Sequence, residues 1–480
     1  MATFSDLDKA EVEADVETAK VTDVENSGKE IVVKPWATRV AEVFYAFAPL
    51  GLIAFGGPAA HIGVLYTQFV EKYGWLDDER FIELMAVGQG LPGPTSTQMV
   101  IATGASHAGL AGGVVAFFLW NIPSFIVLVT FALLSREYID GDELPDPLSG
   151  LPSAATSLVF IAAYKLGMKV LTRDQKLGQE NYVEKIKIFL AAMTTVITLL
   201  VTGENSISVR RVSAAFPALL VIGGIITLMD SRREGKLKNY FRPPDATEEA
   251  ENKSILKRIG ISPYVGVMLV VIWLGLLGAF VGLRGAGVIG ETGLAALFEA
   301  MFRMGSIIYG GGQVVLPMLL TEVVDTGWVT EDQFFQGFAL VQALPGPLFN
   351  FSSFLGAIYL GIEGAFVAWA GLFGPGLILV LAFLPFWMKV RQIAWFKCFL
   401  AGVNAAAIGL VIAATAQLWE AAVESWADAG TFFFTGAFVM FFDPKDAAPK
   451  LSRYWTPIGI FLGGLFGYAL TALDFAQDFD

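Results

Sequence analysis

The chain is poor in cysteine, histidine and charge. Its 480 residues include one cysteine, Cys398, so no disulfide can form within the chain. Two histidines, His61 and His107, are too few for a histidine-rich metal site, and we expect neither a metal nor a cofactor. Charged residues make up 16%, against roughly a quarter in soluble domains, while 55% are hydrophobic and the mean hydropathy is +0.60. These deficits exclude an ordinary soluble domain and indicate an integral membrane protein.

The acidic charge lies mainly in tails and loops. The net charge of −13 argues against nucleic acid as a partner. Residues 1–38 are polar, acid-rich and aperiodic, so we expect a disordered cytosolic tail. Many apolar runs reach the ~20 residues that span a bilayer. We therefore expect a multi-pass protein of the plasma membrane with a cytosolic N-terminus and no cleavable signal peptide.

One tetrapeptide, Leu-Pro-Gly-Pro, occurs twice inside apolar stretches, at 91–94 and 344–347. Two prolines and a glycine cannot continue an α-helix, because proline lacks a donor and clashes with the preceding turn. Unpaired backbone groups are not tolerated against lipid, so such breaks are expected to line a cavity within the protein. The residues expected to break helices, including two glycine-rich runs, are Gly56, Gly57, Pro58, Pro92, Gly93, Gly310, Gly311, Gly312, Pro345 and Gly346.

The two halves of the chain form an internal repeat. A shift of 253 residues places 74–94 on 327–347 with nine identities in 21 residues, among them Gly-Trp, Gln and Leu-Pro-Gly-Pro at fixed spacing. We expect a first transmembrane repeat at 39–229 and a second at 285–480. A charged cytosolic linker at 230–263 and one inverting transmembrane helix at 264–284 would separate them.

Lysine and arginine in the loops predict how the repeats are oriented. The loops are basic at 165–187, 230–258, 389–397 and 445–453 and acidic at 137–146 and 420–428. The span at 109–134 then runs out of the cytosol, and its partner at 362–388 runs back in. The expected fold is an all-α polytopic membrane protein with two inverted-topology repeats. Its broken segments are either re-entrant hairpins, which we favour, or full spans.

The Leu-Pro-Gly-Pro breaks are candidate anion sites. Proline is favoured at the first helical position, and the new helix N-terminus offers free N–H groups and a positive dipole end. Inverted repeats place their substrate near the midplane, where broken elements meet. The candidate substrate-binding residues are His61, Gln89, Pro94, Thr95, Ser96, Thr97, Gln98, Gln313, Gln342, Pro347, Asn350 and Ser352. Because 95–98 is hydroxyl-rich and 348–351 is mostly apolar, the first half should hold most of the anion.

Several polar residues have structural alternatives. His61 is expected to donate to an anion, to titrate near neutrality, or to pack between helices. Glu299 and Arg303 are spaced i,i+4 and either pair along one helix or serve function. Asn121 is expected to hydrogen-bond between helices.

Four segments resemble the motifs of the chromate ion transporter family: Phe55–Gly63, Gln89–Gln98, Tyr309–Pro317 and Gln342–Phe351. The resemblance covers about 40–135 and 292–390. Long members of that family carry two homologous halves of opposite orientation, which agrees with the topology above. The resemblance implies chromate export from the cytoplasm, giving chromate resistance, with sulfate as the related oxyanion.

The expected function is therefore secondary transport of chromate, or of a sulfate-like oxyanion, across the lipid bilayer. The alternatives are an uptake carrier for sulfate or molybdate and an anion channel. An intramembrane enzyme is the least favoured, because no nucleophile–base pair or acid cluster is evident. A homodimer is one possible assembly.

Overall fold

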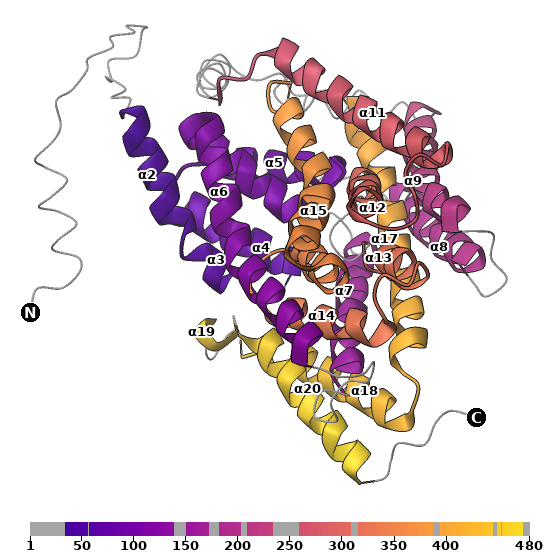
Figure 1. The fold of residues 1–480 in the computed structure, drawn as a ribbon. Coiled ribbons are helices and arrows are strands. Elements are labelled where there is room, and N and C mark those ends of the chain that lie inside the picture. Colours follow the sequence, from indigo (N-terminus) through magenta and orange to yellow (C-terminus); the bar gives the residue numbers. More distant parts are fainter. Residues whose placement is uncertain are drawn as a thin grey trace, which may run out of the picture.

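The computed structural model is helical through the part of the chain that it describes. That part comprises residues 34–55, 57–138, 150–171, 182–202, 209–233, 259–308, 315–386, 394–444, 449–452 and 454–473, and it contains no β-strand (Figure 1). The all-α fold class expected from the sequence is confirmed.

The first repeat begins with α2, whose first residue, Trp36, lies inside the segment 1–38 that the sequence predicts to be a tail. Val43, Ala46 and Phe47 form a buried face that packs this helix against α6. The elements of the repeat are α2 (Trp36–Phe47), α3 (Leu50–Ile53), α4 (Gly57–Tyr66), the π-helical turn η1 (Thr67–Lys72), α5 (Asp78–Gly90), α6 (Thr95–Tyr138), α7 (Leu151–Leu171), α8 (Tyr182–Thr202) and α9 (Val209–Arg233).

The second repeat follows α11 (Pro263–Gly285) and continues to the last described helix. Helices α13, α14 and α15 follow α12 in the order in which α4, α5 and α6 follow α3, so the repeat in the sequence is also a repeat of elements. The elements are α12 (Leu294–Ile307), α13 (Val315–Val324), α14 (Glu331–Ala343), the 3-10 turn η6 (Leu348–Asn350), α15 (Phe351–Phe383), α17 (Ala394–Ala422), α18 (Trp426–Phe441), α19 (Pro449–Ser452) and α20 (Trp455–Ala472).

The repeated Gly-Trp pair has the same conformation in both halves. Gly74 and Gly327 have φ of +59° and +69°, in the left-handed region that glycine adopts without strain. The following N-cap residues, Asp77 and Thr330, each accept a hydrogen bond from the backbone N–H three residues on, which starts α5 and α14. The identities in the sequence therefore mark a shared turn and a shared helix start.

Helices α6 and α15 each turn back on themselves. Gly109 and Gly361, with φ of +73° and +69°, interrupt them at matching positions. A Cβ on Gly104 would lie 2.5 Å from the carbonyl oxygen of Gly112, whereas eight residues of straight helix would separate the two by about 12 Å. The corresponding contact in α15 is as close. Each Leu-Pro-Gly-Pro segment is thus followed by a short half-helix, a tight turn and a long helix.

The long parts of α6 and α15 run antiparallel. The ring of Phe117 lies 5.7 Å from that of Phe373, and the ring of Phe125 lies 5.1 Å from that of Phe366. Going from Phe117 to Phe125 along α6, the contacting residue on α15 moves back from Phe373 to Phe366. The equivalent helices of the two repeats therefore point in opposite directions. This agrees with the inverted orientation predicted from the loop charges.

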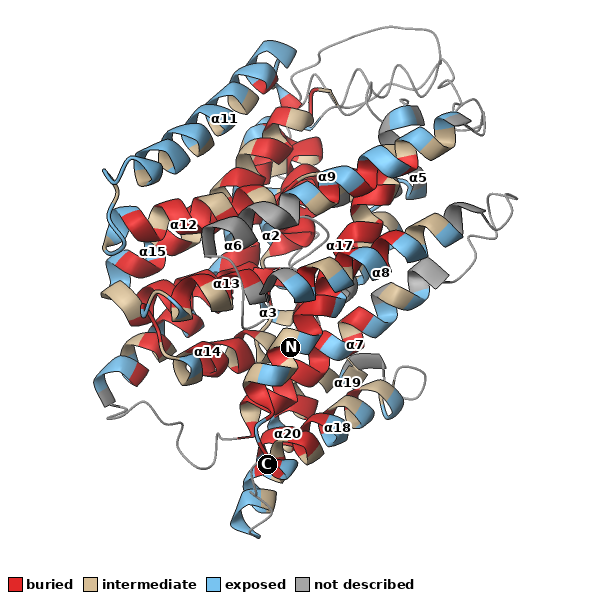
Figure 2. Ribbon diagram, turned by 90° about the vertical axis from the view of Figure 1, so that its right-hand side faces the viewer, coloured by how far each residue is buried: buried red, intermediate tan, exposed pale blue. Residues whose placement is uncertain are grey.

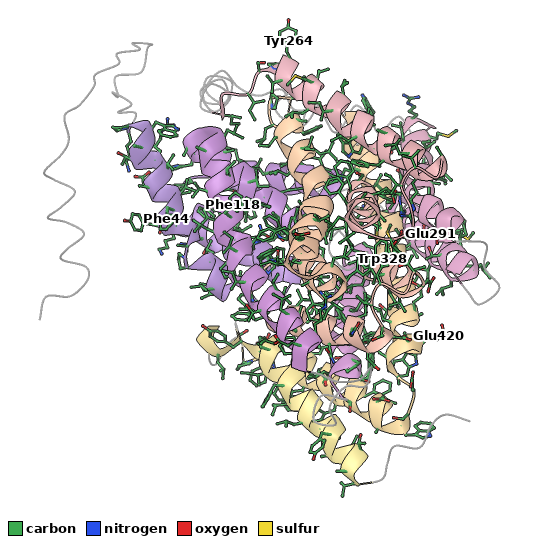
Figure 3. All side chains as sticks on the ribbon, viewed as in Figure 1. Phe44, Phe118, Tyr264, Glu291, Trp328 and Glu420 are labelled. Carbon is green, nitrogen blue, oxygen red and sulfur yellow. The ribbon has the colours of Figure 1, made fainter. Side chains whose placement is uncertain are left out.

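Apolar side chains cover much of the outer surface. Among the described residues, five helices are long and apolar enough to cross a membrane, within α6, α11, α15, α17 and α20. Helix α11 is exposed along most of its length, whereas α17 is largely buried (Figure 2). Phe44 and Tyr264, which are 48% and 87% exposed, project from the outer faces of α2 and α11 (Figure 3). An apolar surface of this extent fits lipid as its surroundings.

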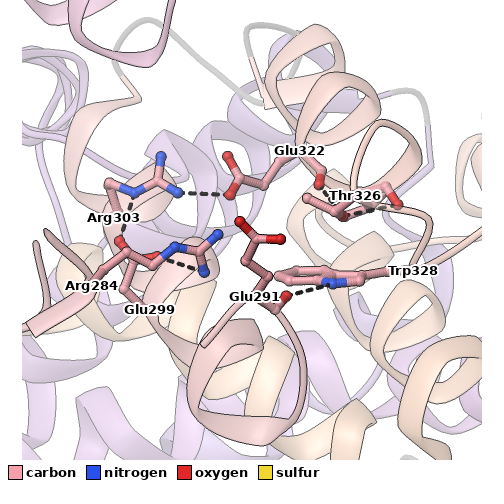
Figure 4. Close-up of polar contacts among 8 residues, drawn as sticks. Arg284, Glu291, Glu299, Arg303, Glu322, Thr326 and Trp328 are labelled. Atoms are coloured by element: carbon pink, nitrogen blue, oxygen red, sulfur yellow. Dashed lines mark hydrogen bonds and ion pairs between the residues drawn. The ribbon is translucent and has the colours of Figure 1, made fainter. Parts of the chain in front are cut away.

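A buried ion-pair network joins α11, α12 and α13 (Figure 4). Arg303 donates to Glu299 over 2.7 Å and to Glu322 over 2.8 Å, and both carboxylates are almost fully buried. Arg284, at the end of α11, lies 3.5 Å from the second oxygen of Glu299. The i,i+4 pair expected along one helix is present. It extends to two further helices, so that two positive and two negative charges balance.

Candidate functional site

Each Leu-Pro-Gly-Pro segment meets the opposite repeat through its glycine. The backbone N–H of Gly93 donates to the carbonyl oxygen of Ile308 over 2.8 Å, and that of Gly346 donates to the carbonyl oxygen of Ala54 over 2.9 Å. Ile308 and Ala54 are the C-cap residues of α12 and α3, two residues before the first glycine of each glycine-rich run. The two contacts form a reciprocal pair of junctions between the repeats.

The opposite long helix also presses against each glycine. A Cβ on Gly93 would lie 2.8 Å from the Cα of Gly376 in α15, and one on Gly346 would lie 2.7 Å from the Oγ of Ser124 in α6. The two glycines have φ of +118° and +109°. Conformation and space both require glycine at these positions, so the tetrapeptides are sites of close contact as well as helix breaks.

The hydroxyl-rich start of α6 connects the two junctions. Gln98 donates to the carbonyl oxygen of Pro92 over 2.7 Å and approaches that of Gly376 at 3.4 Å, beside the first junction. The Oγ of Ser96 lies 3.3 Å from Nδ1 of His61, whose Nε2 lies 3.0 Å from the Ala54 carbonyl oxygen at the second junction. Both side chains are buried.

Thr97 and Thr95 occupy different environments on the same half-helix. The hydroxyl of Thr95 donates to the Gly88 carbonyl oxygen over 3.2 Å. The Oγ1 of Thr97 is buried and has no hydrogen-bond partner within the described residues. A buried unpaired hydroxyl costs free energy. Of the two threonines, Thr97 is therefore the one whose hydroxyl would gain a hydrogen bond from an added ligand.

The start of α15 is held by its neighbours. Asn350 donates to the Asn121 carbonyl oxygen over 3.1 Å and to the hydroxyl of Ser124, while its Oδ1 accepts from the indole of Trp369 over 2.9 Å. The hydroxyl of Ser352 donates to the Phe349 carbonyl oxygen over 2.9 Å. The side chains of Asn350 and Ser352 are therefore engaged within the protein, and the asymmetry of the site stays a prediction.

Trp120 is a residue that the sequence analysis did not single out. Its side chain is fully buried, its ring meets that of His61 edge-to-face at 5.1 Å, and its Nε1 has no partner within the described residues. Gln342 likewise has a buried and unpaired Nε2. A tryptophan three residues before a mid-helix proline, Pro123, was the available signal, but tryptophan is common in membrane helices and the signal is weak.

Other predicted residues lie at or beyond the limits of the described structure. Pro94 directly precedes α6, and Pro347 is the N-cap of η6, so both sit at helix starts. Pro92 and Pro345 lie in the segments between helices. Gly57 and Pro58 belong to the first turn of α4. The residues outside the described part are Gly56, Gly310, Gly311, Gly312 and Gln313, together with the side chain of Gln89.

None of the described side chains that these contacts place at the junctions is charged, so an anion there would depend on backbone N–H groups and neutral side-chain donors. Arg303 lies five residues before Ile308 on α12, but two glutamates neutralise it. The first turn of α6 presents N–H groups with a helix dipole behind them. A neutral, donor-lined segment of this kind suits an anion that needs several donors at once.

Comparison with known proteins identifies the family. A sequence model of the family described as chromate transporter matches residues 41–228 and 295–468, which is most of both repeats. The chain belongs to the chromate transporter family. It is a multi-pass integral membrane protein of that family, in agreement with the resemblance seen in the motifs.

Named relatives in the family cover most of the chain. The chromate transport protein of Pseudomonas aeruginosa is 26% identical over 385 residues, which is 80% of this chain and 82% of the relative. The chromate transport protein of Cupriavidus metallidurans is 24% identical over 427 residues, covering 88% and 92%. An uncharacterised transporter of Methanocaldococcus jannaschii is 23% identical over 401 residues, covering 83% and 89%.

Proposed function

We propose that this protein is a secondary transporter that carries chromate, or a related divalent tetrahedral oxyanion, between the two repeats. The reciprocal contacts of Gly93 with Ile308 and of Gly346 with Ala54 support this most directly. They bring the broken helices of antiparallel repeats together, which is where inverted-repeat transporters bind their substrates. The names of the relatives point to chromate as the ion.

The anion would bind at the start of α6. Backbone N–H groups of residues 95–97 and the hydroxyls of Ser96 and Thr97 would donate to its oxygens, with Gln342 and the Trp120 indole as further donors. Gln98 and Asn350 would act by holding the two Leu-Pro-Gly-Pro segments in place, since their amide nitrogens already donate to backbone. The second repeat would then close the site rather than provide most of its contacts.

Export is the direction that the membrane potential favours. Moving two negative charges out of an inside-negative cell gains about 4–5 kcal/mol at ~100 mV, given ~2.3 kcal/mol per charge. A plasma-membrane exporter with a cytosolic N-terminus would lower cytosolic chromate and so give chromate resistance. Export of the divalent anion by itself therefore needs no partner ion on electrical grounds.

The test compares two threonines of one half-helix. Thr97→Val removes the unpaired hydroxyl and keeps the shape. Thr103→Val makes the same change six residues later, at a threonine that is equally buried and also unpaired. A hydrogen bond to a charged group is worth about 1.5–3 kcal/mol, so Thr97→Val should lower the chromate affinity by about tenfold or more. Thr103→Val should not.

The measurement is chromate flux into proteoliposomes under an imposed potential, with sulfate and molybdate as competing anions. Equal flux by the two variants would refute the assignment of the site to the start of α6. If sulfate competes more strongly than unlabelled chromate, sulfate is the preferred substrate. Flux that does not saturate with concentration would identify a channel.

A further inference from the structure

His61 lies beside the Gly346–Ala54 junction and contacts the proposed anion site. It lies in α4, is fully buried, and bridges the Ala54 carbonyl oxygen and the Ser96 hydroxyl. The same carbonyl oxygen accepts from the backbone N–H of Gly346 in the other repeat. One imidazole therefore contacts the first residues of a candidate anion site and the junction between the repeats.

The hydrogen bonds of His61 define its tautomer. A carbonyl oxygen only accepts, so Nε2 carries a proton that it donates to Ala54. In the neutral ring, Nδ1 is then an acceptor, and the hydroxyl of Ser96 must donate to it. The single proton of Ser96 is thereby engaged and is not available to an anion.

Protonation of His61 reverses this bond. In the imidazolium, Nδ1 carries a proton and donates to Oγ of Ser96, because both ring nitrogens are then donors. The hydroxyl proton of Ser96 becomes free to rotate towards a ligand at the start of α6. One added proton thus produces a positive charge and an additional donor at the site, with no other change in covalent structure.

We infer that His61 and Ser96 form a proton-coupling pair, so that the oxyanion binds together with one proton on Nδ1 of His61. The inference rests on the proposed site at the start of α6. The proton comes from solution, no electrons move, and the loaded site carries one negative charge less than the anion alone. Anion and proton favour each other's binding, because a buried imidazolium without a counter-charge is costly.

The surroundings of His61 favour this role. The ring of Trp120 packs edge-to-face against the imidazole, with the ring centroids 5.1 Å apart. The described residues of α3 and of the two Leu-Pro-Gly-Pro segments contain no titratable side chain. On the elements packed against α4, the titratable and charged groups with described side chains have other surroundings than the buried Ser96. Tyr66 on α4 bonds to Asp78, His107 on α6 pairs with Glu42, and Glu71, Lys72, Arg136 and Glu137 on η1 and α6 are exposed.

Calorimetry tests the inference by counting protons. Chromate is titrated into the purified full chain in two buffers of different ionisation enthalpy, for wild type, His61→Gln and His107→Gln. Wild type should take up about one proton more per anion than His61→Gln. As the pH rises through the range in which the proton is taken up, the chromate affinity of wild type should fall about tenfold more per pH unit than that of His61→Gln. His107→Gln alters the chain's other histidine, which pairs with Glu42, and should match wild type.

The comparison with the variants removes the contribution of chromate itself, which also binds a proton near neutrality. Equal proton uptake by wild type and His61→Gln would overturn the coupling pair. Absence of chromate binding to wild type would instead refute the proposed function. Both outcomes are distinct in the same data set.

A second measurement uses wild type alone, in case His61→Gln does not fold. The chain has two histidines, so ¹⁵N-histidine NMR resolves both rings. Chromate should convert one histidine from the Nε2-H tautomer to the imidazolium, and Ser96→Ala should lower chromate affinity by about tenfold while this conversion persists. Two neutral histidines in the chromate-saturated protein would contradict the inference.

Discussion

Gly93 allows a demanding test of the junction geometry. The substitution Gly93→Ala places a Cβ on a residue with φ of +118°, 2.8 Å from the Cα of Gly376. A Cβ in the left-handed region costs about 1–2 kcal/mol, and overpacking against backbone costs about 1–3 kcal/mol. The expected loss in the free energy of unfolding is therefore about 2–5 kcal/mol. That is a large part of the ~5–15 kcal/mol typical of folded proteins.

The matched control is Gly275→Ala in α11. Nothing lies within 4 Å of the Cβ position at Gly275, so this substitution should stabilise its helix by about 0.5–1 kcal/mol. Both variants are compared by denaturant titration in mixed micelles, followed by tryptophan fluorescence, and by chromate flux in proteoliposomes. Gly93→Ala should also lose more flux than its unfolded fraction accounts for, because the bond from Gly93 to Ile308 must shift. Equal stability and flux for the two variants would refute the reasoning.

Three further substitutions separate structural from binding roles. Arg303→Met should destabilise the protein by about 3–5 kcal/mol, because two buried glutamates lose their shared partner. Thermal unfolding measures this loss, and the double variant with Glu299→Gln should recover part of it. Trp120→Phe removes an unpaired buried N–H but leaves a small cavity, so the two effects on the melting temperature oppose each other, while chromate affinity, measured by calorimetry, should fall by about tenfold. Asn350→Leu should lower the free energy of unfolding by about 1–3 kcal/mol for each group left unpaired, and an unchanged denaturation midpoint would argue against its supporting role.

The sequence predicted the architecture because its signals were redundant. Leu-Pro-Gly-Pro breaks a helix by covalent chemistry alone, and its second copy shares a register with Gly74 and Gly327 at the turns before α5 and α14. The loop charges independently gave the opposite orientation of 109–134 and 362–388. The antiparallel contacts of Phe117 with Phe373 agree with that orientation.

Contacts between distant segments could not be read in the same way. The sequence predicts long spans that start at 109 and 362, but it does not predict that the half-helix packs back on the long helix, with a Cβ on Gly104 only 2.5 Å from the carbonyl oxygen of Gly112. The partners of Asn350 come from α6 and from α15, so its engagement by Trp369 depends on tertiary packing. The same holds for Glu322, which joins the Arg303 pair from another helix.

The most direct test of the central claim is anomalous X-ray diffraction from crystals of this protein grown with chromate, recorded at the chromium absorption edge. The account predicts one chromium peak at the start of α6, within hydrogen-bond reach of Thr97 and Ser96 and between the Gly93 and Gly346 junctions. A peak at Arg284 and Arg303, or on the outer surface with none between the repeats, would contradict it.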